Sequence, residues 1–373
     1  MVYVPRAVHA RISARCNLAC DFCERELLPG PRGRVKTGNL ISFSDGRPPL
    51  DLTRDMPEEV WEAVVARMMP HTDRMELGGL GEPTIAPLFP RAAREVVAAG
   101  KELFFFTNGL TLDRVVDCVG ERPSVSVSID AGTPEGYKAN RGGSLRRLEQ
   151  SVRAFRRGVP RARLSSQYTA TARNIGELPE FVRLCAKLGI GRTGEGELSV
   201  VGADHHVTDR VALSVRFARD ATARAIDEAR EVAEAEGLWL VNNLPPASDA
   251  NPNAITDGSD PRNWRRYTDT LYGDENNPCA PIGSTGVVPP PEAPRPQHDG
   301  FGNARVVVAP REVYVDYNGD VWSCLARHHI GDVLTQDWRS IIEENDAYQQ
   351  WLANWANGIP NANRTCMTCP RLK

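Results

Sequence analysis

A large charge imbalance, long apolar runs and internal repeats are all missing from this sequence of 373 residues. The formal net charge of −3 gives no electrostatic reason to expect binding to nucleic acid or to an anionic membrane surface. Residues 1–15 carry three arginines without the apolar core of a signal peptide, and no later stretch approaches a membrane span. We therefore expect a protein of the reducing cytoplasm, with neither nucleic-acid nor membrane partners.

Nine cysteines are present, and most of them are clustered or paired. In a reducing compartment, clustered cysteines are more often metal ligands than disulfide partners. The candidate ligands are Cys16, Cys20, Cys23, Cys279, Cys324, Cys366 and Cys369. The two isolated cysteines, Cys118 and Cys185, fall in stretches expected to be helical and are predicted to be buried structural thiols.

Short apolar runs alternate with helical patterns over the first 200 or so residues, which indicates βαβ units around a parallel sheet. Six strands suit an α/β fold built as a partial (β/α)6 TIM-type barrel, whose functional residues collect at the C-terminal strand ends. The expected strands are residues 7–13, 74–77, 103–106, 124–129, 163–171 and 197–201, and the expected helices include residues 112–119, 207–237 and 338–355. We predict a barrel at 1–205, a bridging helix and linker at 206–274, and a small cysteine-bearing domain at 275–373.

The first cysteine group has the spacing CxxxCxxC, from Cys16 through Cys20 to Cys23. Three thiolates on one short loop suit three irons of a [4Fe–4S] cube, because soft sulfur ligands favour iron–sulfur clusters. The fourth iron then stays open for a substrate or a cofactor. The alternative is a zinc site completed by a distant ligand, although zinc sites more often pair two CxxC units or a CxxC with an HxxxH unit.

The residues around this motif resemble the radical S-adenosylmethionine (SAM) superfamily over about residues 7–201. The aromatic Phe22 precedes the last cysteine, and residues 78–83 (GGLGEP) resemble the family's glycine–glycine–glutamate–proline motif. The resemblance implies a [4Fe–4S] cluster and SAM as cofactors, and cleavage of SAM to methionine and a 5′-deoxyadenosyl radical that abstracts a substrate hydrogen. It also implies an external one-electron reductant such as flavodoxin or ferredoxin.

The same resemblance implies which residues lie along SAM. They are Gly79, Gly81, Glu82, Asn108, Ser128, Asp130 and Arg141. The two glycines and the glutamate are expected beside the methionine amino group, and Ser128 and Asp130 near the ribose or the carboxylate. Arg141 is expected to pair with that carboxylate in fork geometry. Residues 24–55 are longer than a short βα loop and are expected to help wall the active site.

Four further cysteines, Cys279, Cys324, Cys366 and Cys369, are enough for a [4Fe–4S] cube or for one zinc ion, and spacing alone leaves both open. The stretch that leads to the second of them resembles the auxiliary-cluster domains called SPASM and twitch. In those domains a β-hairpin leads to a ligand, a helix follows, and a CxxC closes the site. The resemblance implies one auxiliary [4Fe–4S] cluster, as in the shorter twitch form. A Pro-rich insertion separates Cys279 from the other three.

The sequence leaves more than one reaction open. A chain that resembles the twitch-type dehydrogenases of aminocyclitol antibiotic pathways is expected to oxidise an alcohol of a small polar substrate and to pass an electron to the auxiliary cluster. Glu195 and Glu197, at the end of the expected sixth strand, are candidate general bases. The alternatives are a sugar epimerase or a maturase of ribosomal peptides, although no leader-binding domain is expected before the first strand. A zinc-bound scaffold is the non-enzyme alternative.

Overall fold

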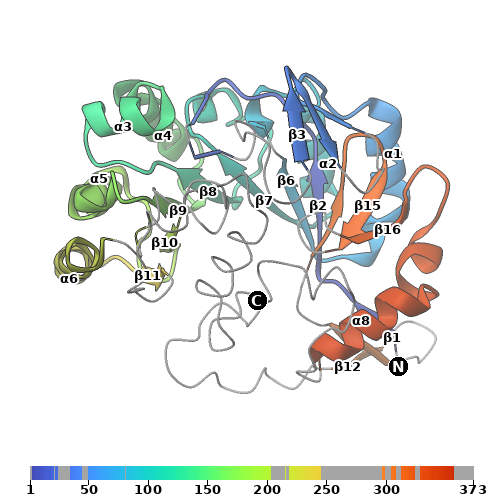
Figure 1. Cartoon of the computed structure of the whole chain (residues 1–373). Helices are drawn as coiled ribbons and strands as arrows, with labels where there is room; N and C mark the ends of the chain where they lie inside the picture. Colours follow the sequence, from blue (N-terminus) through green and yellow to red (C-terminus); the bar gives the residue numbers. More distant parts are fainter. Residues whose placement is uncertain are drawn as a thin grey trace.

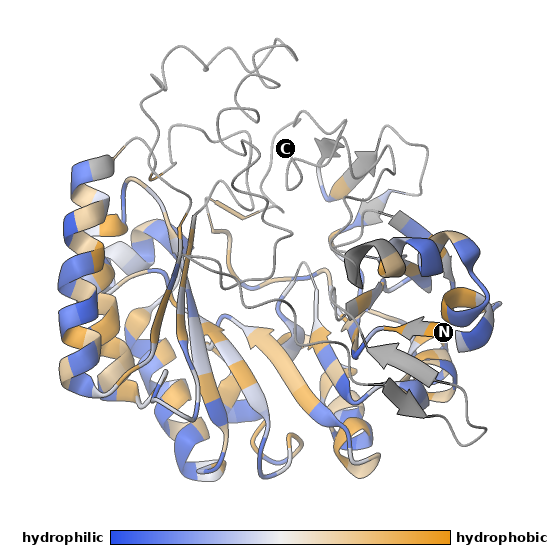
Figure 2. Cartoon of the chain, turned by 90° about the horizontal axis from the view of Figure 1, so that it is seen from below, coloured by the Kyte–Doolittle hydropathy of each residue, from blue (hydrophilic) through white to orange (hydrophobic). Residues whose placement is uncertain are grey.

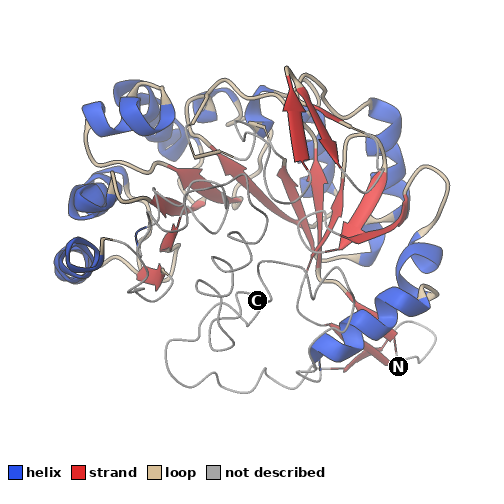
Figure 3. Cartoon of the chain, in the orientation of Figure 1, coloured by secondary structure: helices blue, strands red, loops and turns tan. Residues whose placement is uncertain are grey.

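The computed structural model describes residues 2–20, 22–23, 34–43, 49–79, 81–202, 215, 218–244, 296–298, 304–307, 312–323 and 328–356. A curved sheet runs through the molecule, and helices cover its outer face (Figure 1). Figure 3 shows that strands and helices alternate along this sheet, as the sequence pattern predicts.

Ten strands form the main sheet, in the order β11-β10-β9-β8-β7-β6-β2-β14-β15-β16. Neighbours from β11 to β14 are parallel, whereas β14–β15 and β15–β16 are antiparallel. The strands are β2 (Ala7–Arg11), β6 (Arg74–Gly78), β7 (Glu102–Thr107), β8 (Ser124–Ser128), β9 (Arg163–Ala170), β10 (Leu198–Gly202), β11 (Leu240–Asn243), β14 (Glu312–Val315), β15 (Asp320–Ser323) and β16 (His328–Asp332). All six expected barrel strands are present, and the partial TIM-type barrel is confirmed.

Helices follow most of the barrel strands, and capping residues set several of their ends. The α-helices are α1 (Glu58–Arg67), α2 (Phe89–Ala98), α3 (Pro134–Arg141), α4 (Leu145–Gly158), α5 (Leu178–Leu188), α6 (Arg219–Glu236) and α8 (Asp346–Ala356), and 3-10 turns are η2 (Met69–His71), η3 (Pro83–Ile85), η4 (Leu112–Arg114) and η5 (Ile175–Glu177). Thr133 caps α3 by accepting a hydrogen bond from the Gly136 N–H at 3.0 Å, and Gly142 ends it at a φ of 71°. No helix within the described ranges is long and apolar enough to cross a membrane.

Three expected helices differ from the structure. Residues 112–119 form only η4 and the turns after it, where Arg147 and Ser151 of α4 hold the carboxylate of Asp113 at 2.7 and 3.0 Å. The helix expected at 207–237 is described only as α6, because residues 203–214 lie outside the described part. The helix expected at 338–355 is divided into a π-helical turn, η10 (Arg339–Glu343), and α8. Asn345 lies between them and caps α8 by accepting from the Tyr348 N–H at 3.1 Å.

Two small sheets flank the main one. The segment after the first cysteine group contains the antiparallel strands β3 (Arg34–Thr37), β4 (Leu40–Phe43) and β5 (Leu50–Asp51). The second small sheet joins β1 (Val2–Val4), β13 (Ala304–Val307) and β12 (Pro296–His298), and β1 also contacts α8. The predicted domain boundaries after residues 205 and 274 fall outside the described residues.

The two faces of the barrel sheet differ in polarity. Phe105 packs edge-on against Phe89 of α2, with ring centroids 5.1 Å apart, which identifies the helix-covered face. Residues on that face are apolar and buried: Val8, Ala10, Met75, Leu77, Phe105, Val125 and Val127. Because strand side chains alternate, the opposite face carries His9, Glu76, Phe104, Phe106, Ser126 and Gln167. Figure 2 shows orange, hydrophobic stretches along the strands and blue, hydrophilic faces on the helices.

Both isolated cysteines are buried, as predicted. Cys185 lies on α5 and is fully buried. Cys118 lies in the turns after η4, and its thiol donates a hydrogen bond to the Val115 carbonyl oxygen at 3.1 Å. Burial raises the pKa of both thiols, so both stay protonated at neutral pH and are poor ligands or nucleophiles.

Candidate functional site

The cysteine loop, defined here by Cys16, Cys20 and Cys23, begins directly after β2. Backbone hydrogen bonds fix its entry: the Ile12 N–H donates to the Gly78 carbonyl oxygen at 3.0 Å, and the Ala14 N–H donates to the Arg54 carbonyl oxygen at 2.9 Å. Cys20 is buried, and the other two cysteines are half-buried. The loop is therefore held at the C-terminal edge of the parallel sheet, where TIM-type barrels carry their chemistry.

The glycine motif after β6 lies against the backbone that leads into the cysteine loop. A side chain on Gly79 would contact the Ser13 carbonyl oxygen, and one on Gly81 would contact that of Arg15. The Gly81 N–H donates to Ser13 O at 3.2 Å, and the Glu82 N–H donates to Arg15 O at 2.7 Å. Gly79 also has a φ of 149°, which favours glycine. Because these two glycines lack side chains, the turn after β6 can lie directly against the backbone that leads into the cysteine loop. This contact positions the cysteines.

Glu82 is buried and accepts hydrogen bonds from its neighbours through both carboxylate oxygens. Oε1 accepts from the Thr84 N–H at 3.1 Å, from the Thr84 hydroxyl at 2.5 Å and from the Thr107 hydroxyl at 2.8 Å. Oε2 accepts from the Asn108 N–H at 2.6 Å. Burial raises the pKa of Glu82, and these donors oppose that effect. The carboxylate thus ties the turn after β6 to the turn after β7.

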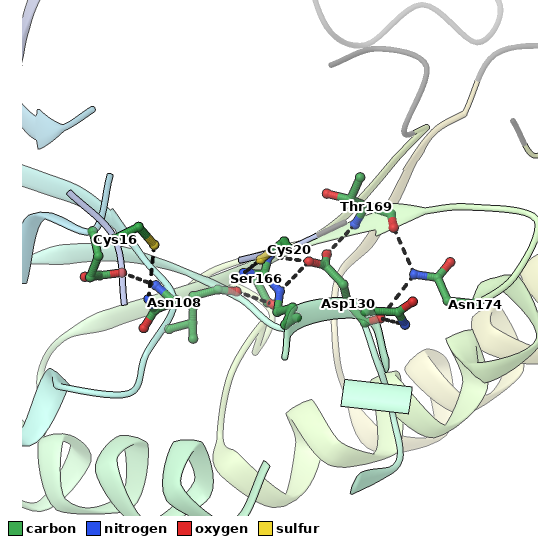
Figure 4. A network of polar contacts seen from close by, with 11 residues as sticks. Cys16, Cys20, Asn108, Asp130, Ser166, Thr169 and Asn174 are labelled. Carbon is green, nitrogen blue, oxygen red and sulfur yellow. Dashed lines mark hydrogen bonds and ion pairs between the residues drawn. The ribbon is translucent and has the colours of Figure 1, made fainter. Parts of the chain in front are cut away.

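Asn108 lies at the end of β7 and contacts the cysteine loop directly. Its amide Nδ2 donates to Asn17 Oδ1 at 2.7 Å and approaches Cys16 Sγ at 4.0 Å (Figure 4). Its Oδ1 accepts from the Leu110 N–H at 3.0 Å, which fixes the orientation of the amide. An N–H group is therefore directed at the first cysteine sulfur.

Asp130 follows β8 in the left-handed region, at a φ of 55°, which is uncommon for a residue other than glycine. One carboxylate oxygen accepts from the Thr169 N–H at 2.5 Å, and the other from Arg141 Nε at 2.5 Å. Its carbonyl oxygen accepts from the side-chain amides of Asn140 and Asn174, each at 3.1 Å. Asp130 therefore joins the ends of β8 and β9 to α3, as Figure 4 shows for Thr169 and Asn174.

Arg141, at the end of α3, brings a buried positive charge to the cysteine loop. It forms an ion pair with Asp130, and its Nη1 donates to Cys20 Sγ at 3.8 Å. The guanidinium also lies 5.7 Å from the centre of the Phe22 ring. The pKa of Asp130 is raised by burial, and Arg141 opposes that rise. A fixed cation beside a cysteine sulfur favours the thiolate form that metal binding needs.

Two expected catalytic residues lie elsewhere. Glu195 and Glu197 precede β10, so they lie at its N-terminal end rather than at the C-terminal end where we expected them. Glu195 is ion-paired at 3.5 Å with Arg156 of α4, and the Glu197 N–H donates to the Ser165 hydroxyl near the start of β9. The expected position of these two glutamates is therefore wrong. Ser128 ends β8 as expected and pairs with Gln167 of β9.

Several polar residues that build the site were not predicted as site residues from the sequence. They are Thr84, Thr107, Thr169 and Asn174, which bind Glu82 or Asp130. Only Thr107 belongs to a recognisable turn, the Thr-Asn-Gly after β7. Threonine and asparagine are common in turns, so no pattern separates these four from others.

The donors around the cysteine loop fit an iron–sulfur cluster. Asn108 and Arg141 direct N–H groups at Cys16 and Cys20, and hydrogen bonds to sulfur are a regular feature of such centres. Among the described residues, no three His, Cys, Asp or Glu side chains converge on a single-ion site. The cysteines of a cubic cluster bind different irons, so they need not converge on one point. The N–H donors at Cys16 and Cys20 thus fit an iron–sulfur cluster on this loop.

The C-terminal hairpin joins the sheet beside the strand that leads to the cysteine loop. β14 pairs with β2 in parallel, and Arg11 Nη1 contacts Asp316 Oδ1 at 3.0 Å. The Tyr317 hydroxyl accepts from the Asp51 N–H at 2.8 Å, in the segment after the loop. The predicted auxiliary ligands Cys279, Cys324, Cys366 and Cys369 lie outside the described residues.

Comparison with known families identifies two domains. Residues 11–185 match the radical SAM superfamily, and residues 308–370 match SPASM, an iron–sulfur cluster-binding domain. The first range contains the whole cysteine loop, and the second contains three of the four predicted auxiliary ligands. The first domain implies a [4Fe–4S] cluster and SAM, and the second implies auxiliary iron–sulfur clusters.

Curated relatives are distant and are matched in part. A probable GTP 3′,8-cyclase of Methanococcus aeolicus is 21% identical over 192 residues, which are 50% of this chain and 57% of that protein. The tungsten-containing aldehyde ferredoxin oxidoreductase cofactor-modifying protein of Pyrococcus furiosus is 23% identical over 197 residues, 49% of each chain. The chain thus spans about half the length of the curated relatives that it matches.

A solved structure shares the fold. Streptococcus suis SuiB, bound to S-adenosylmethionine, aligns with 99% of this chain and 71% of its own, at a TM-score of 0.56 and 13% identity. At that identity the likeness concerns the fold alone. The family matches show that this chain combines a radical SAM domain, which carries the cysteine loop, with a C-terminal SPASM domain.

Proposed function

We propose that the cysteine loop holds the radical-generating [4Fe–4S] cluster and that SAM binds beside it, along Asn108, Asp130 and Arg141. The supporting observation is the pair of N–H donors, from Asn108 and Arg141, that reach two of the three thiols. When bound, the cluster supplies the electron that cleaves SAM and so generates the radical that abstracts a substrate hydrogen.

The residues around the cysteine loop have different roles in this proposal. Arg141 keeps a buried positive charge for the carboxylate of SAM, because Asp130 holds its guanidinium in place. Ser128, at the end of β8, is placed near the ribose. Glu82 is mainly a positioning residue, since its carboxylate already accepts four hydrogen bonds from the protein. Gly79 and Gly81 bring the backbone of this turn against the cysteine loop.

For the overall reaction we propose oxidation of an alcohol in a small polar substrate, such as a sugar or an aminocyclitol. Removing a hydrogen atom and then a proton leaves one electron that needs an acceptor. The SPASM domain supplies a place for that acceptor, and β14 attaches this domain to the first barrel strand. The polar face of the sheet carries Ser126 and Gln167, uncharged groups that suit a hydroxylated substrate. The initial electron would come from an external reductant such as flavodoxin or ferredoxin, in the cytoplasm.

The test is an anaerobic reaction with SAM, a reductant, and sugars or aminocyclitols deuterated at the carbinol carbon. Mass spectrometry should show a product lighter by the carbinol deuterium and one proton, and 5′-deoxyadenosine that carries deuterium. A product that has lost no hydrogen atoms overall, but in which hydrogen from solvent has replaced the deuterium, would indicate an epimerase instead. Turnover of a peptide but of no small polar alcohol would contradict the proposed substrate class.

A further inference from the structure

The hydroxyl of Tyr137 is a buried polar group without a hydrogen-bond partner among the residues that the structure describes. The side chain lies on α3 and is fully buried. An unsatisfied buried hydroxyl is costly, because it has lost its bonds to water without gaining others. We therefore expect this hydroxyl to form a hydrogen bond with a group that binds next to it in the functional protein.

Tyr137 lies between α3 and the cysteine loop. A side chain on Gly143 would meet Tyr137 Cε1 at 2.9 Å and Leu18 Cδ2 at 3.0 Å, so the ring is a neighbour of the loop residue Leu18. Arg141 is four residues further along α3, on the same face, and its guanidinium donates to Cys20 Sγ at 3.8 Å. The phenol therefore shares the face of α3 that is turned to the second cysteine.

The electrostatic surroundings agree with this position. Burial raises the pKa of Tyr137, the charges of Asp130, Cys20 and Glu82 add to the rise, and Arg141 opposes it. The hydroxyl therefore keeps its proton at neutral pH and is available as a donor. The carboxylates of Asp130 and Glu82 already receive other donors, whereas an iron–sulfur cluster on the loop would present sulfur acceptors.

We infer that Tyr137 is a positioning and tuning residue whose hydroxyl donates a hydrogen bond to a sulfur of the cluster bound by the cysteine loop. The inference rests on the proposed function, which places the cluster there. A donor to sulfur stabilises the more negative, reduced state of a cluster and so raises its reduction potential. Tyr137 would therefore ease the entry of the electron that cleaves SAM.

The experiment compares wild-type holoenzyme with Tyr137→Phe, which removes only the hydroxyl. Redox titration monitored by electron paramagnetic resonance gives the potential of the SAM-binding cluster, identified by the change of its signal when SAM is added. At a fixed potential we expect the ratio of reduced to oxidised cluster to fall about three- to tenfold in the variant, as a difference of the size of one ordinary hydrogen bond between the two states suggests. The shift should be present without SAM.

Tyr168→Phe is the matched control. Tyr168 is also fully buried on the barrel, but its hydroxyl donates to the Asn174 carbonyl oxygen at 2.5 Å. This variant should leave the cluster potential unchanged and lower the melting temperature of metal-free protein. Tyr137→Phe should not lower that temperature, since its hydroxyl has no partner to lose within the described protein.

The outcomes separate this inference from the proposed function. An unchanged potential in Tyr137→Phe, with a cluster present, would overturn the inference alone. A shift that appears only with SAM bound would overturn it too, because the hydroxyl would then bind SAM. A fall in the melting temperature of metal-free Tyr137→Phe equal to that of Tyr168→Phe would reveal a partner within the protein. Wild-type enzyme without a cluster on the cysteine loop would overturn the proposed function itself.

Discussion

The imidazole of His9 is buried on the polar face of the sheet, two residues before the end of β2. It faces Glu76 of β6 at 3.6 Å, and its ring centroid is 4.9 Å from that of Tyr314 on β14. Burial, together with the nearby charges of Arg11 and Arg74, lowers the pKa of His9 to about 3. The neutral form is therefore the one that the folded protein holds at neutral pH.

The low pKa of His9 predicts that the free energy of unfolding decreases in acid. Because its pKa is depressed, its contribution is present above about pH 6.5 and is lost as the pH falls toward about 3. The loss is at most about 5 kcal/mol for a shift of this size. In urea titrations of metal-free protein, His9→Gln should lose less stability than wild type between these two pH values. Equal losses would show that His9 is not buried as a neutral group.

For Glu82 and Asp130, the sequence predicted the positions of the residues but not their hydrogen-bond partners. The family resemblance singled out both positions in the sequence, Glu82 after β6 and Asp130 after β8. Their partners Thr84, Thr169 and Asn174 were not identified, because these hydrogen bonds join turns that are distant along the chain. Local patterns identify the residue at a strand end, whereas the fold decides which side chains meet it.

At the level of elements, the turn after β6 controls where the cysteine loop lies. Gly81→Ala would push a methyl group into the backbone of residues 14 and 15, which is packed around the motif and has little freedom to move. We expect the variant to displace the loop and to lose most of the iron bound there. The measurement is iron per chain after anaerobic reconstitution, in protein whose fold is confirmed by circular dichroism.

Gly176→Ala, in η5, provides the control for that prediction. A side chain at Gly176 meets nothing within 4 Å, so this variant should keep its iron and its fold. Full iron content in Gly81→Ala would contradict the claim that this close approach positions the cysteines. Loss of iron in both variants would point to a general effect of glycine replacement.

The elements were predicted well where strands are buried and regular, and less well in helices. Short apolar runs between helical stretches located all six barrel strands, because a strand buried under helices needs such a run. The helix at 112–119 failed because Asp113 is bound by α4, and the helix at 338–355 was divided by the capping residue Asn345. Those interruptions depend on tertiary contacts and on single side chains rather than on periodicity.

For the whole molecule, the main sheet connects both domains. β2 leads to the cysteine loop, and β14, its parallel neighbour, belongs to the SPASM range. The resemblance to the auxiliary-cluster domains implied the hairpin β14–β15, but it did not imply the attachment of this hairpin to β2. A pairing between strands so distant along the chain, such as that of Ala10 with Val315, leaves no local trace in the sequence.

The proposed function predicts that changes in the predicted auxiliary ligands separate SAM cleavage from product formation. Replacing Cys366 and Cys369 together with Ala should leave 5′-deoxyadenosine formation and deuterium transfer from substrate, but little ketone should form. The reason is that hydrogen abstraction needs only the first cluster, whereas oxidation needs an acceptor for the second electron. The double variant must first be shown to be folded, since metal ligands can also stabilise a small domain. A normal yield of ketone per SAM would show that the auxiliary site has only a structural role.

The most direct measurement is formation of 5′-deoxyadenosine by Cys20→Ala under anaerobic reducing conditions, compared with Cys118→Ala. Cys20 lies in the cysteine loop beside Arg141, whereas Cys118 is a buried thiol bonded to the Val115 carbonyl oxygen. If the cysteine loop generates the radical, Cys20→Ala forms no 5′-deoxyadenosine and Cys118→Ala forms it at close to the wild-type rate. Formation at the wild-type rate by Cys20→Ala would contradict the assignment of the radical cluster to this loop.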